Sequence, residues 1–281
     1  MTRRKLREEI KDRLKKAGIE DFDYESWVFL EWILGVDRGE FFMDPDRDVP
    51  VKQYKRLEEM LAKREKRVPL QYLMGTCAFM GYAFKVDERV LIPRQDTECL
   101  VELAVAQIQR EKKEKPLRVL DLCTGSGCIG ISIKLLCPET EVVLSDLSAD
   151  ALAVAEENAR TLGAEVLLKQ GDLFSSIEGK FDYLIANPPY IPTAVIGELM
   201  PEVQEHEPWM ALDGAADGLY FYRKIINAAG EYLHAGGWLM FEIGQEQGED
   251  LLTLLRDGGF VETEIRKDLA GLDRIAVGRK K

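Results

Sequence analysis

The sequence predicts an α/β protein in two parts: a small helical domain, then a larger domain built on a doubly wound, mainly parallel sheet. Three observations support this prediction. Apolar residues recur at helical spacing through residues 2–66, short apolar runs alternate with helical segments from residue 118 onward, and a glycine-rich turn follows the first of those runs. The chain has 281 residues, of which 46% are hydrophobic, so it is long enough to bury two cores.

Residues 1–75 are predicted to form a bundle of amphipathic helices. Apolar side chains fall on one face in each of three stretches, with charged residues between them. The second stretch stops at Gly35, a residue type that commonly ends helices. The expected helices span residues 2–17, 23–34 and 51–66.

A hairpin and a helix are expected to follow this bundle. Residues 76–92 contain two short alternating runs around a glycine, which is typical of a β-hairpin linking two domains. Pro93 then opens a helix that continues to about Gln109, with Asp96 or Thr97 as the expected cap. The segment Glu111–Lys115 is interpreted as a charged linker.

Residues 93–281 are predicted to form the second domain, and their strands and helices alternate in the order typical of a doubly wound sheet. The last two strands are expected to pair antiparallel at one edge. The functional site is expected at the carboxyl ends of the parallel strands. The expected strands are 118–123, 141–146, 165–170, 181–187, 237–243, 261–267 and 274–278, and the main expected helices end near 136 or span 149–162, 217–233 and 249–256.

The net charge of −12 is concentrated in the second part of the chain. Residues 1–75 hold 17 Lys and Arg against 16 Asp and Glu, whereas residues 76–281 hold 21 against 34, a balance of −13. An acidic domain repels phosphate backbones. Nucleic acid is therefore disfavoured as the direct substrate, while a protein partner remains compatible with this charge.

Membrane insertion, secretion and metal binding are not expected. The sequence contains no apolar run of the roughly 18 residues that a membrane span requires, and no apolar signal core follows the basic N-terminus. The five cysteines form no CxxC pair, and the chain has only two histidines. We therefore expect a cytoplasmic protein with reduced cysteines and no metal site.

The segment 121–130 (DLCTGSGCIG) links the first strand of the sheet to a helix and predicts a cofactor site. Its glycines allow a ligand to approach the backbone closely before the helix begins. Asp146 ends the second strand 21 residues after Gly125, where a carboxylate can accept both hydroxyls of a ribose. Because residues 125–130 formally match the dinucleotide fingerprint, a nicotinamide cofactor and S-adenosylmethionine both fit this pattern.

Two acidic residues favour S-adenosylmethionine over a dinucleotide. Asp121 lies just ahead of the glycines, where its carboxylate would hold an ammonium group but repel a pyrophosphate. Asp172 and Leu173 follow the third strand and are expected to hydrogen-bond and cover the edge of an adenine. A simple turn cap is the alternative role for Asp172.

The segment Asn187-Pro188-Pro189-Tyr190 ends the fourth strand and predicts the second half of the site. Two prolines cannot continue a sheet, so a stiff loop begins here. The side-chain carbonyl of Asn187 and the backbone carbonyl of Pro188 are free acceptors, and Tyr190 offers a flat ring. This arrangement suits a planar group that bears NH2, such as adenine, cytosine or a glutamine amide.

Taken together, these motifs resemble the release factor glutamine methyltransferases over nearly the whole chain. The resemblance lies in Pro69–Gly75, in Leu91–Glu98, in Asp121–Gly127 and in Asn187–Ile191. It implies a Rossmann-like, seven-stranded class I methyltransferase domain with S-adenosylmethionine as cofactor. It also implies that the helical domain 1–75 recognises the substrate and that residues 76–92 form the linking hairpin.

The resemblance also implies roles for individual residues. The family's cofactor loop falls on Cys123, Thr124, Gly125, Ser126 and Gly127, its ribose carboxylate on Asp146, its adenine contact on Leu173 beside Asp172, and its catalytic and substrate loop on Asn187, Pro188, Pro189 and Tyr190. Asp121 and Asn187 complete the expected cofactor contacts. The sequence departs from the family pattern at Cys123, where glycine is usual, and at Gln95, where proline is usual. If position 123 requires a positive φ, the cysteine would be strained.

The implied activity is methylation of the side-chain amide nitrogen of the glutamine in the Gly-Gly-Gln loop of peptide chain release factors, by a monomeric enzyme. Three alternatives remain at this point. They are an N6-adenine nucleic-acid methyltransferase with the same loop, a nicotinamide-dependent oxidoreductase that uses the glycines differently, and a binding module with an inactive cofactor site. The oxidoreductase alternative leaves Asn187–Tyr190 unexplained, and the adenine alternative would need a basic channel.

Overall fold

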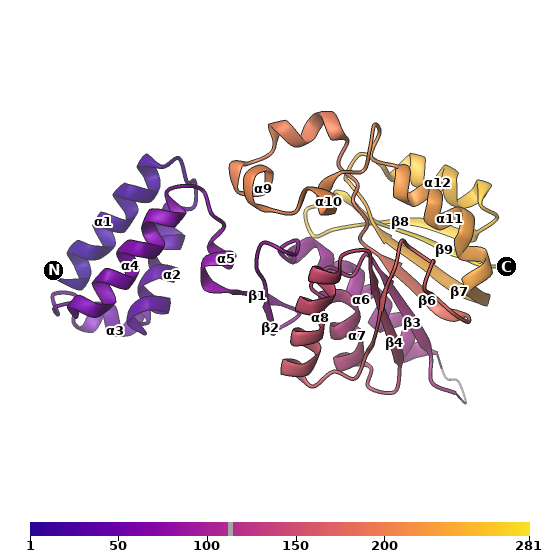
Figure 1. The fold of residues 1–281 in the computed structure, drawn as a ribbon, viewed down its shortest axis with the longest axis horizontal. Coiled ribbons are helices and arrows are strands. Elements are labelled where there is room, and N and C mark those ends of the chain that lie inside the picture. The colour runs from indigo at the N-terminus through magenta and orange to yellow at the C-terminus, as the bar shows by residue number, and fades with distance from the viewer. Residues whose placement is uncertain (112–114) are drawn as a thin grey trace. The chain divides into compact units, whose positions relative to one another are not determined.

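The computed structural model describes residues 1–111 and 115–281, so most of the predicted charged linker 111–115 lies outside the described residues. The chain divides into two compact units, which Figure 1 shows with the course of the chain. Unit 1 comprises Met1–Gly75 together with Pro201–His206, and unit 2 comprises Thr76–Met200 together with Glu207–Lys281. None of the helices in the described ranges is long and apolar enough to cross a bilayer.

Unit 1 is a helical bundle, as predicted. Its helices are α1 (Arg3–Lys16), α2 (Phe22–Leu34), α3 (Arg38–Met43), α4 (Val51–Arg64), α5 (Leu70–Met74) and α9 (Pro201–His206). The apolar faces of α1, α2 and α4 meet in one core, in which Leu6, Leu30 and Leu57 are fully buried. Gly35 ends α2 in the left-handed conformation with a φ of 64°, as its position predicted. The short α3 and α5 were not predicted because five or six residues show no periodicity.

The segment that contains α9 is tied to the bundle by a buried ion-pair network. Both carboxylate oxygens of Glu202 accept hydrogen bonds, one from Arg64 at 2.8 Å and one from Arg67 at 2.6 Å. The guanidinium of Arg64 also pairs through two nitrogens with Glu25. Because these groups are buried and mutually neutralised, residues 201–206 belong structurally to the helical unit although they lie far along the sequence.

Unit 2 begins with the predicted hairpin, formed by β1 (Thr76–Phe79) and β2 (Tyr82–Lys85). The helix α6 (Gln95–Arg110) follows, and its N-cap is Arg94. The prediction that Asp96 or Thr97 caps this helix is therefore wrong. Both residues lie inside its first turn, where Asp96 pairs with Arg274 at 3.4 Å and Thr97 is buried.

The sheet of unit 2 has seven strands in the order β5-β4-β3-β6-β7-β9-β8. The strands from β5 to β7 run parallel, β9 inserts antiparallel beside β7, and β8 pairs antiparallel with β9 at the edge, as predicted for the last pair. The observed strand boundaries differ most from the predicted ones at β7, which begins at Leu233, four residues before the predicted start at residue 237. The bounds are β3 Arg118–Leu122, β4 Glu141–Asp146, β5 Leu167–Gln170, β6 Phe181–Ala186, β7 Leu233–Glu242, β8 Val261–Lys267 and β9 Asp273–Arg279.

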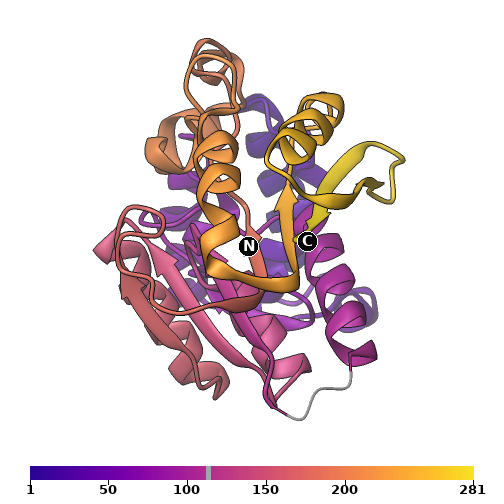
Figure 2. The same ribbon diagram turned by 90° about the vertical axis from the view of Figure 1, so that its right-hand side faces the viewer.

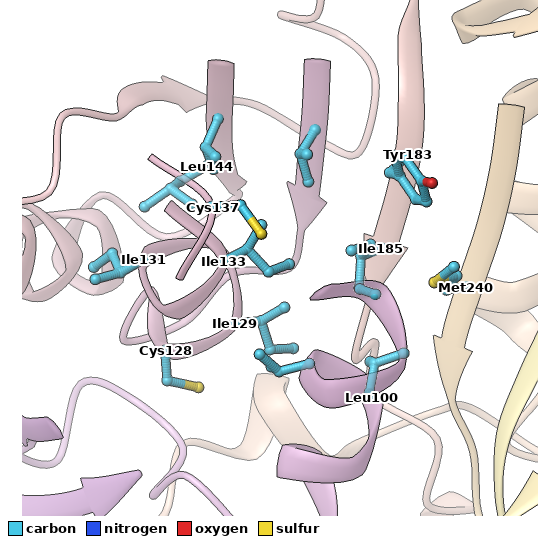
Figure 3. Close-up of a cluster of buried hydrophobic side chains, with 14 of the residues drawn as sticks. Leu100, Cys128, Ile129, Ile131, Ile133, Cys137, Leu144, Tyr183, Ile185 and Met240 are labelled. Atoms are coloured by element: carbon cyan, nitrogen blue, oxygen red, sulfur yellow. The ribbon is translucent and has the colours of Figure 1, made fainter. Parts of the chain in front are cut away.

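Helices cover both faces of this sheet (Figures 1 and 2). Successive strand residues alternate between two cores, as Val119 and Leu120 of β3 illustrate. The first core, part of which Figure 3 shows, joins the strands to α6, α7 (Cys128–Leu136) and α8 (Ala149–Leu162). The second core joins them to α11 (Tyr220–Tyr232) and α12 (Gly248–Asp257). This three-layer packing leaves the carboxyl ends of β3, β4 and β6 open for a site.

Candidate active site

A pocket of about 360 Å³ lies in unit 2 at the carboxyl ends of β3 and β4, within the range typical of ligand sites. Its position is the one predicted for a doubly wound sheet. The lining residues that the sequence predicted are Cys123, Thr124, Gly125, Ser126, Asp146, Asp172, Leu173, Asn187 and Pro189.

The glycine-rich turn takes the backbone through the left-handed region three times before α7 begins. The φ angles are 58° at Cys123, 54° at Gly125 and 81° at Gly127. A β-carbon at Gly127 would lie 2.6 Å from the terminal Cδ1 of Ile131 and 3.2 Å from the β-carbon of Ala155, and at a φ of 81° any side chain would be strained. The strain expected at Cys123 is present, because a cysteine occupies a conformation that costs roughly 1–2 kcal/mol for a residue with a β-carbon. Burial raises the pKa of the Cys123 thiol, which therefore stays neutral.

Asp121 lies behind the turn and holds its shape. Its Oδ2 accepts a hydrogen bond from the Thr124 hydroxyl at 2.5 Å and another from the Gly130 amide at 2.9 Å. Its Oδ1 is buried and has no hydrogen-bond partner among the described residues. Burial raises the pKa of this carboxyl to about 7, against the opposing effect of the two hydrogen bonds. Asp121 is not among the residues that line the pocket, so its contact with an ammonium group stays a prediction.

Asp146 lines the pocket at the end of β4. Its Oδ2 accepts a hydrogen bond from the Gly125 amide and its Oδ1 accepts one from the Ser148 amide, both at 2.9 Å. Burial raises the pKa of Asp146, while these backbone hydrogen bonds lower it. Each oxygen keeps a further lone pair, so the carboxylate is fixed in place and can still accept hydroxyl donors.

Apolar side chains form the wall next to Asp146. Leu173 lines this wall with a φ of 49°, and Phe221 and Leu147 lie there as well. Sequence reasoning missed Leu147, although its place directly after Asp146 was a usable signal. The carboxylate of Asp172 is mostly exposed and lies 4.0 Å from the Lys224 ammonium. A carboxylate in the same pocket as apolar side chains suits a nucleoside, whose ribose is polar and whose base is largely apolar.

Of the four residues of the predicted acceptor loop, Asn187–Tyr190, all of which the structure describes, two line the pocket. Asn187 and Pro189 line the pocket, whereas Pro188 and Tyr190 do not. The side chain of Asn187 has no hydrogen-bond partner among residues 1–111 and 115–281, so its amide is available to a ligand. The Tyr190 hydroxyl donates to Glu242 Oε1 at 3.4 Å, and its ring packs against the second core. Burial raises the pKa of Tyr190 well above its usual range.

The remaining wall comes from two segments whose side chains were not predicted to contribute. Arg94 lines the pocket and donates from one nitrogen to both oxygens of Glu207, at 2.8 and 2.7 Å. Trp209 lines it as well, and its indole nitrogen donates to Asp213 at 3.2 Å. No sequence pattern marked the residues of 207–213, because their placement depends on long-range packing.

The residues present fit S-adenosylmethionine. Asp146 offers a carboxylate for a ribose, Leu147 and Leu173 offer apolar cover for a base, and the unpaired Oδ1 of Asp121 offers an acceptor close to the glycine turn. No cluster of metal-ligating side chains occurs among the described residues. With the sheet order given above, fold and site define a class I S-adenosylmethionine-dependent methyltransferase.

Comparison with known proteins gives the family. Residues 5–75 match the family model described as the PrmC N-terminal domain, and residues 100–199 match the one described as the methyltransferase small domain. The release factor glutamine methyltransferase of Geobacter sulfurreducens is 40% identical over 99% of this chain and 96% of its own length. That of Moorella thermoacetica is 40% identical over 98% and 97%. The chain belongs to the release factor glutamine methyltransferase family.

A solved structure supports the fold independently. A methyltransferase from Pyrococcus furiosus superimposes with a TM-score of 0.51 and 14% identity, covering 82% of this chain and 98% of that protein. Family membership confirms the prediction of an S-adenosylmethionine-dependent methyltransferase and decides against the nicotinamide-dependent oxidoreductase.

Proposed function

We propose that this enzyme methylates the side-chain amide nitrogen, N5, of the glutamine in the Gly-Gly-Gln loop of peptide chain release factors. The observation that supports this most is the side chain of Asn187, which lines the pocket without a partner from the described chain. Two prolines follow it and keep its loop stiff. The names of its relatives point to the same class of substrate.

The chemical difficulty is the low nucleophilicity of an amide nitrogen, whose lone pair is delocalised into its carbonyl group. Bound S-adenosylmethionine supplies an electrophilic methyl group. The Asn187 side-chain carbonyl and the Pro188 backbone carbonyl accept the two hydrogens of the substrate amide. These bonds aim the nitrogen and favour its pyramidalisation as the new bond forms.

The other residues of the site hold these two acceptors and the nucleoside in place. Asp146, fixed by the amides of Gly125 and Ser148, binds the ribose hydroxyls. Tyr190 anchors the acceptor loop through its hydroxyl, which donates to Glu242, and through its ring, which packs against the second core. The nitrogen loses its proton late, after the methyl group has moved, to the same acceptors or to water.

The test is transfer of a labelled methyl group from S-adenosylmethionine to purified release factor. Two parallel reactions contain a release factor with Gln→Ala in its Gly-Gly-Gln loop, and DNA. We expect label on the unmodified factor alone. Label on the Gln→Ala factor would place the modification elsewhere, and label on DNA would move the substrate to adenine.

A further inference from the structure

Gln247 lies in the loop between β7 and α12, contacts the acceptor loop at Tyr190, and is not among the residues that line the pocket. Its Nε2 donates to the carbonyl of Tyr190 at 3.1 Å and to that of Gly218 at 3.3 Å. Its Oε1 accepts from the Gly244 amide at 2.9 Å. One amide group therefore joins three segments that are far apart in sequence, using both of its N–H donors and its acceptor.

The backbone of Tyr190 packs closely against two glycines of the segment 214–218. A β-carbon at Gly218 would lie 2.3 Å from the Tyr190 carbonyl oxygen, and one at Gly214 would lie 2.8 Å from the Tyr190 Cα. Such distances exclude any residue but glycine unless the backbone shifts. The segment 214–218 therefore packs directly against the backbone of Tyr190, and Gln247 hydrogen-bonds to both.

Backbone hydrogen bonds also hold the residue after Tyr190, whereas the side chain of Asn187 has no hydrogen-bond partner among the described residues. Ile191 exchanges backbone hydrogen bonds with Leu212 and Gly214 at 3.0 and 2.8 Å. Between Asn187 and Tyr190 stand only Pro188 and Pro189, whose φ angles are restricted by their rings. A displacement of the Tyr190 carbonyl is therefore transmitted along a stiff link to the side chain of Asn187.

We propose that Gln247 is a positioning residue for methyl transfer: it holds the Tyr190 carbonyl and thereby sets where Asn187 and Pro188 present their acceptors. This inference rests on the proposed function of that loop and adds a residue outside both the glycine turn and the acceptor motif. Gln247 is not among the residues that line the pocket, so its loss should affect the rate of transfer rather than binding of the cofactor.

The decisive variant is Gln247→Glu, which keeps the shape and the acceptor for Gly244 but replaces the donating nitrogen by an oxygen. At neutral pH the carboxylate of Q247E faces the carbonyls of Tyr190 and Gly218. We expect kcat for release factor methylation to fall about 10- to 100-fold, the loss that a small misplacement of reacting groups produces. The dissociation constant for S-adenosylmethionine, measured by calorimetry, should stay within about threefold of the wild-type value.

The pH dependence separates positioning from a merely structural role. Burial next to two carbonyl oxygens raises the pKa of the Q247E carboxyl, so mild acid protonates it and restores one donor to the Tyr190 carbonyl. The kcat ratio of Q247E to wild type should therefore rise as the pH falls. In Gln247→Met, which is similar in length but has no donor at any pH, kcat should be low and this ratio should stay flat.

Gln245→Glu is the matched control, because it makes the same chemical change at an exposed position two residues away. Its kcat should equal that of the wild type at every pH. A kcat for Q247E within twofold of the wild type, a ratio that is independent of pH, or an equal loss of cofactor affinity would each overturn the positioning role. Absence of transfer by the wild-type enzyme itself would instead overturn the proposed function, and with it the premise of this inference.

Discussion

The two loops that meet in the pocket are stabilised in opposite ways. In the glycine turn, Asp121 and Asp146 each accept two hydrogen bonds from within residues 121–148, and Asn158 of α8 donates to the carbonyl of Ser126, so the turn is held from the two strand–helix units that adjoin it in sequence. In the acceptor loop, the side chain of Asn187 makes no hydrogen bond to the described residues. Tyr190 is held by two distant residues: Gln247 donates to its carbonyl, and its hydroxyl donates to Glu242. The glycine turn thus depends on the units next to it in sequence, whereas the acceptor loop depends on residues more than 50 positions away. The following changes test that contrast, from the largest expected effect to the smallest.

Asn187→Ala should break the substrate side alone. We expect kcat to fall about 100- to 1000-fold, as when one oriented polar group is removed from a transition state. The affinity for S-adenosylmethionine should stay within about threefold, since the glycine turn and Asp146 do not depend on this side chain. Steady-state kinetics and calorimetry measure the two quantities. Asn227→Ala, an exposed position on α11, is the control, and an Asn187→Ala enzyme that kept most of its activity would refute the assigned role.

Asp146→Ala should break the cofactor side alone. Loss of a charged acceptor for two hydroxyls is expected to weaken S-adenosylmethionine binding by about 1.5–3 kcal/mol, roughly 10- to 100-fold. The value of kcat at saturating cofactor should change less than the affinity does. Calorimetric titration measures the first effect, with Asp150→Ala at the exposed start of α8 as control. An unchanged affinity would show that the ribose is held elsewhere.

Asp121→Asn should change how the stability of the glycine turn, and with it the free energy of unfolding, depends on pH. Because the pKa of Asp121 is raised from 3.8 to about 7 in the folded state, the native protein binds more protons than the unfolded chain in that range. Stability from this group is therefore present at low pH and is lost as the pH rises towards 7. The Asp121→Asn variant lacks this slope, and its free energy of unfolding should exceed that of the wild type by about 1–2 kcal/mol at alkaline pH. Chemical denaturation across this pH range measures the difference.

The same variant also tests whether Asp121 holds an ammonium group. If it does, bound S-adenosylmethionine lowers the pKa of Asp121, and Asp121→Asn binds the cofactor more weakly despite being more stable. Stability without loss of affinity would limit Asp121 to its observed role of fixing Thr124 and Gly130.

Cys123→Gly should have the smallest effect. Glycine removes the penalty of a β-carbon at a φ of 58° but makes the unfolded chain more flexible. The net gain in unfolding free energy is expected to be about 0.5–1 kcal/mol, with a slight gain in cofactor affinity. Thermal unfolding measures it, and a lower midpoint for Cys123→Gly would show that the thiol contributes packing that outweighs the strain.

Much of the fold followed from short-range patterns in the sequence. Helical spacing placed α1, α2 and α4, and apolar runs placed the seven strands, because periodicity reports which face of an element is buried. Gly35 could be anticipated from its place at the end of a helical pattern, whereas the possible strain at Cys123 was anticipated from the glycine that is usual there in the family. The glycine turn before α7 was predictable for the same local reason as Gly35.

What only the tertiary structure decided involves residues brought together from distant parts of the chain. The sequence placed Tyr190 at the substrate, but in the structure its ring packs against the second core. Gln247, 57 residues away, carries no signal of its own. Arg94 and Trp209 reach the pocket wall, and residues 201–206 join the helical unit. Local sequence determines backbone conformation over a few residues, whereas the partners of a side chain are set by strand order and by the packing of helices on the sheet.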